Sequence, residues 1–338
     1  MKIKEFCMVV LCTCLFMACE KGDDEVFDPI KPPIEQPEKP VDPEQPEEPE
    51  KPVTPPSIND IININIGGIK MIVGSNNWLA IAYGGGKYVA VAKDNYVTSS
   101  SNGTSWSTPK QISFTELLEL KAIAYGGGKF MAFGYKSNYG SCFTTSSDGV
   151  TWSTPVRLAE TKNQNISTVI YVNGRFIASS GNGRVIASDD NGNTWKILGD
   201  FSGRNLVCSC YDSEHNIVAL AGSSSFLYST DKGENWTVTY PIQLGYQVRG
   251  VAYGGGSWVC VGAEYTTSHS TDLSTWTRVN ANNIFSTKMA GVVYGNGKFV
   301  AISSGSRIGY STDGGITWQD ATEVTDRVAT PNALCVMP

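Results

Sequence analysis

Arginine residues occupy matching positions in a repeated part of this chain. Arg184 and Arg307 each stand four residues before the serine of a repeated Ser-x-Asp turn, and Arg204 and Arg249 belong to segments between repeats. A guanidinium group binds carboxylates through a planar, forked set of N–H donors. If these side chains converge, they suit an anionic ligand such as an acidic sugar. The alternative is that they are scattered, solvated side chains, because spacing alone does not show convergence.

Aromatic and acidic side chains occur in the same segments. The tyrosines that could offer stacking surfaces are Tyr96, Tyr135, Tyr139 and Tyr265. Glu264 and Asp94 are the carboxylates that could take part in glycoside hydrolysis, which requires two acidic groups around one bond. Glu264 and Tyr265 are adjacent in a strand pattern and therefore point to opposite faces, which weakens them as a catalytic pair. Catalysis therefore has little support in the sequence.

Other reactive motifs are missing. The sequence has no Gly-x-Ser-x-Gly elbow and no phosphate-binding loop. With only His215 and His269 in the whole chain, no zinc site is expected, and Asp189-Asp190-Asn191 lacks the glycine and glutamate of a calcium loop. We therefore expect neither a metal nor a cofactor.

Two short sequence motifs recur six times, both with a period of about 42 residues. One begins at a tyrosine, as in Tyr83-Gly-Gly-Gly-Lys, and the other is a turn of the form Ser-x-Asp-(x)-Gly-x-x-Trp. In the second copy, 120–125 and 129–133 read as two strands joined by glycines, and two further strands flank the turn at 146–152. Four short antiparallel strands per repeat are typical of a β-propeller blade.

The residue types in the repeated turn have structural roles. The aspartate can accept hydrogen bonds from backbone N–H groups, the glycine takes a left-handed conformation, and the tryptophan buries its ring between sheets. The structural residues that we assign to the turn are Asp148, Trp152, Asp190, Trp195, Asp231, Trp236, Asp272, Trp276, Asp313 and Trp318. In the first copy Asn102 replaces the aspartate, and in the fifth Ser274 is taken to replace the glycine.

These turns resemble the Asp boxes, or bacterial neuraminidase repeats, of sialidase-like β-propellers. The resemblance covers residues 77–320 and implies an all-β propeller of four-stranded blades. The segments 60–66 and 69–73 form a possible hairpin, and 332–336 aligns with the first strand of each repeat. Sharing one blade between the two ends gives seven blades, with six as the alternative.

The faces of such a propeller differ in expected role. The glycine-rich turns and the Ser-Asp turns share one face, where both are structural. Ligand binding is expected on the opposite face, where Arg184 and Arg307 would face each other across the central funnel. The Arg-containing motif that sialidases carry ahead of the first box is missing, since no arginine precedes Arg157.

The first residues resemble a bacterial lipoprotein leader. Residues 1–18 carry two lysines and a short apolar run, and Met17-Ala18-Cys19 resembles a lipobox, which implies lipidation at Cys19. Residues 19–56 are the lipidated N-terminus and a stalk, in which prolines recur at every third position from Pro37 to Pro55. We expect the propeller to occupy residues 57–338 and the protein to be exposed at the outer membrane.

Charge and cysteine content exclude some classes of function. The stalk holds most of the acidic excess, and residues 57–338 carry nineteen acidic and twenty basic side chains. A nearly neutral folded part has no basic field for nucleic acid. The five cysteines after Cys19 show no paired spacing typical of disulfides. We therefore expect a monomeric, non-catalytic envelope lipoprotein that binds a glycan or a protein partner. The alternatives are a diverged sialidase-like exo-glycoside hydrolase and a scaffold in a membrane complex.

Overall fold

The computed structural model describes residues 53–66, 68–161, 164–223, 225–240, 247–262, 265–321 and 330–337. The expected signal peptide (1–18), Cys19 and almost all of the stalk lie outside these residues. Among the described residues the helices are two short 3-10 turns, η1 (Ile58–Asp60) and η2 (Ala159–Thr161). Neither of these is long and apolar enough to cross a membrane.

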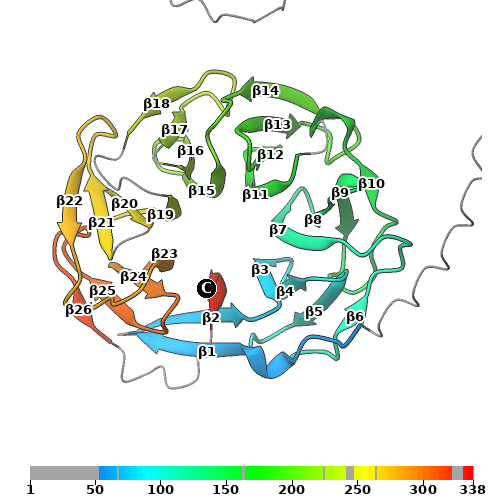
Figure 1. Cartoon of the computed structure of the whole chain (residues 1–338), viewed down its shortest axis with the longest axis horizontal. Coiled ribbons are helices and arrows are strands. Elements are labelled where there is room, and N and C mark those ends of the chain that lie inside the picture. Colours follow the sequence, from blue (N-terminus) through cyan, green and yellow to red (C-terminus); the bar gives the residue numbers. More distant parts are fainter. Residues whose placement is uncertain are drawn as a thin grey trace, which may run out of the picture. The chain divides into compact units, whose positions relative to one another are not determined.

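The described strands form seven antiparallel sheets arranged in a ring (Figure 1). Six sheets have four strands each and follow one another along the chain, and we number them blades 1 to 6. From the innermost strand outward, blade 1 contains β3 (Trp78–Gly84), β4 (Lys87–Ala92), β5 (Tyr96–Ser100) and β6 (Lys110–Gln111), and blade 2 contains β7 (Glu119–Gly126), β8 (Lys129–Lys136), β9 (Gly140–Ser146) and β10 (Val156–Arg157). Blade 3 contains β11 (Ile166–Val172), β12 (Arg175–Ser180), β13 (Arg184–Ser188) and β14 (Lys196–Asp200), and blade 4 contains β15 (Leu206–Asp212), β16 (Ile217–Gly222), β17 (Ser225–Ser229) and β18 (Thr237–Thr239). Blade 5 contains β19 (Val248–Gly254), β20 (Ser257–Gly262), β21 (Thr266–Ser270) and β22 (Thr277–Asn280), and blade 6 contains β23 (Met289–Gly295), β24 (Lys298–Ser303), β25 (Ile308–Ser311) and β26 (Gln319–Asp320). The predicted seven-bladed, all-β propeller is confirmed.

The seventh sheet joins the two ends of the described chain. Its innermost strand is β27 (Pro331–Val336), which pairs with β2 (Ile69–Ser75), and β2 pairs in turn with β1 (Ile61–Ile66). This closing blade has three strands among the described residues. β27 packs against the innermost strands β3 and β23 of the neighbouring blades. The ring is therefore closed by a blade shared between the two ends, as the sequence predicted.

The hydrophobic core is divided into seven clusters, one between each pair of neighbouring blades. Between blades 2 and 3, for example, the rings of Phe133 and Trp195 meet edge to face with centroids 5.6 Å apart. Inner strands alternate their side chains between the two neighbouring seams, so each blade is buried on both faces. Burial on both sides explains why the strands carry almost continuous apolar runs.

The repeated Ser-Asp turns have one hydrogen-bonding pattern. In blade 4 the Ser229 hydroxyl donates to Asp231 Oδ1 (2.7 Å) and accepts from the backbone N–H of Gly233 (2.7 Å). Asp231 Oδ1 also accepts from the N–H of Asn235 (2.9 Å). In the fifth copy the left-handed position is held by Leu273 (φ 63°), so our assignment of Ser274 to the glycine position was wrong. The shorter form of the turn places its left-handed residue one position earlier.

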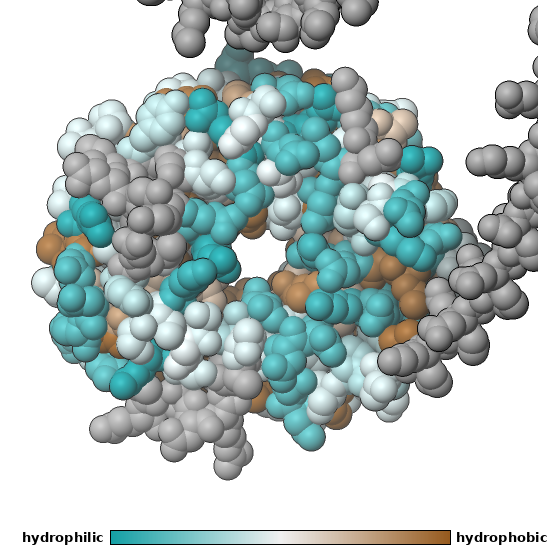
Figure 2. Space-filling view, in the orientation of Figure 1, coloured by the Kyte–Doolittle hydropathy of each residue, from teal (hydrophilic) through white to brown (hydrophobic). Residues whose placement is uncertain are grey.

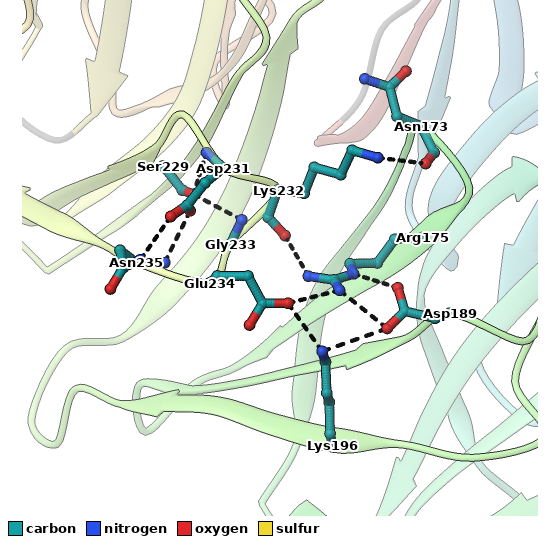
Figure 3. A network of polar contacts seen from close by, with 10 residues as sticks. All are labelled: Asn173, Arg175, Asp189, Lys196, Ser229, Asp231, Lys232, Gly233, Glu234 and Asn235. Carbon is teal, nitrogen blue, oxygen red and sulfur yellow. Dashed lines mark hydrogen bonds and ion pairs between the residues drawn. The ribbon is translucent and has the colours of Figure 1, made fainter.

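An ion network joins the turns of blades 3 and 4 (Figure 3). The Arg175 guanidinium, a tenth exposed, binds Asp189 through Nε at 2.5 Å and Glu234 through Nη2 at 2.7 Å. Lys196 Nζ approaches the same Glu234 carboxylate at 2.9 Å. The hydrogen bond from Arg175 holds the pKa of Asp189 below its ordinary value. The network links neighbouring blades and uses all of its charged groups in doing so.

The two faces of the ring differ as expected. Lys87, the first residue of β4 after the glycine-rich turn, donates to the Asp148 carbonyl oxygen in the Ser-Asp turn of the next blade at 2.9 Å. The glycine-rich turns and the Ser-Asp turns therefore share one face, which we call the turn face. We call the opposite face, on which the innermost strands begin, the loop face.

Candidate functional site

A cavity of about 450 Å³ occupies the centre of the ring, and its lining residues come from all seven innermost strands. Figure 2 shows the corresponding opening, surrounded by both hydrophilic and hydrophobic residues. Seven strands that run side by side around an axis leave a channel lined by their edges. Residues from every blade therefore meet here.

Each innermost strand carries a β-bulge near its first residue. In β19 the pairing register moves from Val248 directly to Gly250, which leaves Arg249 without a partner residue on β20. The same shift occurs in the other six blades. A bulge re-aims the side chain of the extra residue. The residues at this position are Leu79, Lys121, Ser167, Val207, Arg249, Ala290 and Asn332, and all seven line the central cavity. We call this set the bulge ring.

Small residues follow the bulge in every blade. A Cβ at Gly250 would lie 2.8 Å from the Val292 backbone nitrogen, and one at Gly291 would lie 2.7 Å from Leu334. A side chain at these positions would therefore hold the inner strands apart. The seven residues are Ala80, Ala122, Thr168, Cys208, Gly250, Gly291 and Ala333. Their small size keeps the bulge ring narrow.

The charges of the bulge ring are all positive. Among the described residues that line the cavity, only Lys121 and Arg249 are charged. Lys121 Nζ is 2.7 Å from Glu119 Oε2, so its charge is partly balanced. Arg249 is exposed and makes no hydrogen bond or ion pair with another described residue. An exposed, unengaged guanidinium beside a cavity is available to a carboxylate ligand.

The other predicted arginines are engaged elsewhere. The Arg184 side chain is 7% exposed, and its guanidinium binds Asp200 Oδ2 at 2.5 Å and the Glu160 carbonyl oxygen at 2.8 Å. Arg204 donates to Ser225 and lies over the Tyr240 ring. Arg307 is 46% exposed and lies 3.7 Å from Asp320. None of these three lines the central cavity, so the structure does not place Arg184 and Arg307 on opposite walls of the funnel.

The predicted tyrosines are dispersed. Tyr96 is buried, and Tyr139 packs against Phe114 and Arg157. Tyr265 is exposed, with a left-handed backbone (φ 59°). Tyr135 lines a separate pocket on the loop face. The tyrosines therefore do not form one aromatic platform.

The candidate catalytic carboxylates do not form a pair. Glu264 lies outside the described residues. Asp94 is half-buried in a left-handed turn, where its carbonyl oxygen accepts from Gln111, and it does not line the central cavity. The cavity lining that the structure describes contains no aspartate or glutamate.

One group on the turn face has the composition of a metal site. Ligand atoms of Asp212, Glu214 and His215 lie within 4.8 Å of one another. Asp212 Oδ1 accepts from the backbone N–H groups of Glu214 and His215, and its Oδ2 is 2.7 Å from His215 Nδ1. These bonds account for the cluster as a structured turn between β15 and β16.

Lys121 was missed by the sequence reasoning although a signal was present. Lys121 stands four residues before Tyr125, and Arg249 stands four residues before Tyr253. Counting back from the six repeated tyrosines identifies six of the seven bulge-ring residues, and the seventh, Asn332, stands four residues before Val336. The same count from the serine of the Ser-Asp turn, which indicated Arg184 and Arg307, leads instead to the third strands of the blades.

Comparisons with known proteins agree with the fold. Residues 107–246 match the family described as the DUF6242 beta propeller domain. No curated protein matches the sequence. The structure is similar to that of YCF48 bound to D1 peptide, with a TM-score of 0.62 and 12% identity over 80% of this chain and 89% of that chain. It is also similar to YCF48 from Cyanidioschyzon merolae, with a TM-score of 0.60 and 13% identity over 79% and 90% of the two chains.

A third similar structure is a chain of the nidogen/laminin complex. Its TM-score is 0.54 at 9% identity, over 74% of this chain and 98% of that chain. Identities this low show a shared fold and do not transfer a function.

Proposed function

We propose that the protein is a non-catalytic binding propeller whose central cavity receives an acidic segment of a protein partner. The observation that carries the proposal is Arg249, a cation that projects from a β-bulge into the cavity and has no partner among the described residues. A ligand carboxylate would accept a forked pair of hydrogen bonds from its guanidinium.

The rest of the bulge ring supports this ligand class. Lys121 adds a second positive charge, which Glu119 partly balances, and Ser167 and Asn332 offer hydrogen-bonding groups. Leu79, Val207 and Ala290 are apolar, so apolar side chains of the partner that lie next to its carboxylate can also be buried against the bulge ring. Because the described lining holds no acidic residue, a bound anion meets no like charge there.

A protein partner is favoured by the similar structures. One of them is described as bound to a peptide, and another belongs to a complex of two proteins. Likeness of fold is an analogy, and it supports the choice of partner class without identifying the partner. We therefore expect an exposed acidic loop or tail, recognised by charge and by a few apolar contacts.

The proposal is tested with the full chain and an array of peptides in which the number of acidic residues varies. Peptides that bind are then measured by fluorescence anisotropy against the wild type, Arg249→Ala and Arg278→Ala. Arg278 is an exposed arginine of β22 that makes no bond with other described residues, and it serves as the matched control. We expect acidic peptides to be enriched and Arg249→Ala to weaken them about tenfold or more.

Salt and the control variant complete the test. The affinity is expected to fall as the NaCl concentration rises, because the contact is partly exposed, and Arg278→Ala should bind like the wild type. An array without preference for acidic peptides, or equal binding by Arg249→Ala, would overturn the proposal.

A further inference from the structure

We propose a second binding site, on the loop face between blades 2 and 4, that takes a neutral carbohydrate. A pocket of about 500 Å³ lies there, and it shares no lining residue with the central cavity. Its lining residues are Tyr135, Gln164, Asn165, Gly181, Asn182 and Asn205. Four of these six residues have side-chain amides, and none is charged or aliphatic.

The pocket is assembled from four separate segments. Tyr135 lies near the end of β8, and Gln164 and Asn165 directly precede β11. Asn182 belongs to the turn between β12 and β13, and Asn205 directly precedes β15 (Figure 1). The site therefore depends on three consecutive blades.

Most polar groups of the pocket have no partner among the described residues. Asn165 Oδ1 is buried and accepts no hydrogen bond from a described residue. The amides of Asn182 and Asn205 and the hydroxyl of Tyr135 are likewise unengaged among the described residues. Gln164 uses only its Oε1, which accepts from Ser180 Oγ at 2.7 Å. Because Asn165 Oδ1 is closed off from the surface, the polar groups available to a ligand are the amides of Asn182 and Asn205 and the hydroxyl of Tyr135.

The backbone around these amides is held in place. Ser141 Oγ donates to the Gln164 carbonyl oxygen at 2.5 Å and accepts from the Ile166 N–H at 3.3 Å. The Gly181 N–H donates to the Asn165 carbonyl oxygen at 3.0 Å. The amides therefore project from a fixed framework, which lowers the entropy lost when a ligand binds.

The chemistry of the lining matches sugar hydroxyls. An amide side chain offers both donors and an acceptor, and a sugar hydroxyl group can accept a hydrogen bond from the amide nitrogen and donate one to the amide oxygen. Tyr135 adds an aromatic ring whose apolar face can lie against a sugar ring. The lining residues that the structure describes offer no cation to a phosphate or carboxylate and no aliphatic surface to the side chains of a peptide. A neutral sugar fits these features better than either alternative.

The experiment uses the full chain on an array of neutral oligosaccharides from mannan, galactan, xylan and β-glucan, with sialylated and uronic-acid glycans for comparison. Retained sugars are titrated calorimetrically against the wild type, Asn182→Ala and Asn205→Ala. Asn282→Ala is the matched control, because Asn282 is an exposed asparagine outside the pocket. Asn182 is exposed and its amide bonds no described residue, so Asn182→Ala is expected to fold normally.

We expect a neutral oligosaccharide to bind, and Asn182→Ala and Asn205→Ala each to weaken it about tenfold. Asn282→Ala should leave its affinity unchanged. Arg249→Ala should also leave it unchanged, so this site and the proposed function of the central cavity can fail separately.

Three results would overturn the proposal. The first is that the wild type retains no neutral oligosaccharide at about 1 mM. The second is that a variant combining Asn182→Ala and Asn205→Ala binds neutral oligosaccharides as well as the wild type. The third is that the protein retains only acidic glycans and that Arg249→Ala abolishes this retention, which would place glycan binding in the central cavity.

Discussion

At the scale of single residues, the glycine after the repeated tyrosine is a packing requirement between blades at three junctions, those that follow blades 1, 2 and 5. A Cβ at Gly84 would lie 2.0 Å from Cγ of Tyr125, the tyrosine of the next blade. Gly126 has the same relation to Tyr171, and Gly254 to Tyr294. At these three junctions the tyrosine ring of one blade lies directly on the backbone of the preceding blade, and a glycine leaves the necessary room, whereas blades 3 and 4 carry Val172 and Asp212 at the same position.

We predict that Gly84→Ala destabilises the protein by about 1–3 kcal/mol, because the tyrosine ring or the backbone must move. Gly295→Ala is the matched control: it has the same place in the repeat, but its Cβ would meet Val336 at an ordinary 3.4 Å. Urea unfolding of both variants checks this. Equal losses of stability would show that the packed tyrosine is not the cause.

At the scale of the elements, the Ser-Asp turn is stabilised by an ionised carboxylate. The N–H of Asn235 lowers the pKa of Asp231 to about 2, and the N–H of Thr275 does the same for Asp272. A carboxylate with a lowered pKa in the folded state adds stability above its unfolded pKa, and this stability disappears as the pH falls through the folded value. In the first copy Asn102 Oδ1 accepts from Thr104 and Ser105, so a neutral amide can hold the same turn.

We therefore predict that the thermal midpoint falls between pH 4 and pH 2 as these turns are protonated. Asp231→Asn should fold at pH 7, because Asn102 shows that an asparagine suits the turn, and it should lose less stability over that interval than the wild type. Calorimetry at a series of pH values measures both midpoints. An unchanged slope in Asp231→Asn would show that Asp231 does not contribute to the acid sensitivity.

At the scale of the whole molecule, the ring depends on the blade that joins its ends. β27 supplies the innermost strand of that blade, and its Ala333 is buried against Trp78 and Ile81 of the first blade. Without β27 the innermost strands β3 and β23 would lose their neighbour. An open ring would expose two apolar blade faces, since each seam has its own hydrophobic cluster.

We predict that a chain ending at Thr330 no longer unfolds in one cooperative transition and aggregates or unfolds well below the wild-type midpoint. A chain ending at Val336, which keeps β27, is the control and should behave like the wild type. Circular dichroism melting and size-exclusion chromatography distinguish them. A monomeric truncated chain with the wild-type midpoint would contradict the role given to β27.

The architecture could be predicted from the sequence, because a strand pattern and a turn motif that recur with one period are recognisable without any long-range contact. The six repeats, the hairpin at 60–73 and the strand at 332–336 were enough to predict seven blades and the shared closing blade. Which side chains are available to a ligand depends on how the blades meet in the folded ring. Arg184 stands opposite Asp200 in the register of β13 and β14, so its charge is used within the blade, whereas Arg249 lies at a bulge without such a partner. Cross-strand register and the meeting of residues from different blades are properties of the closed ring, and local spacing does not contain them.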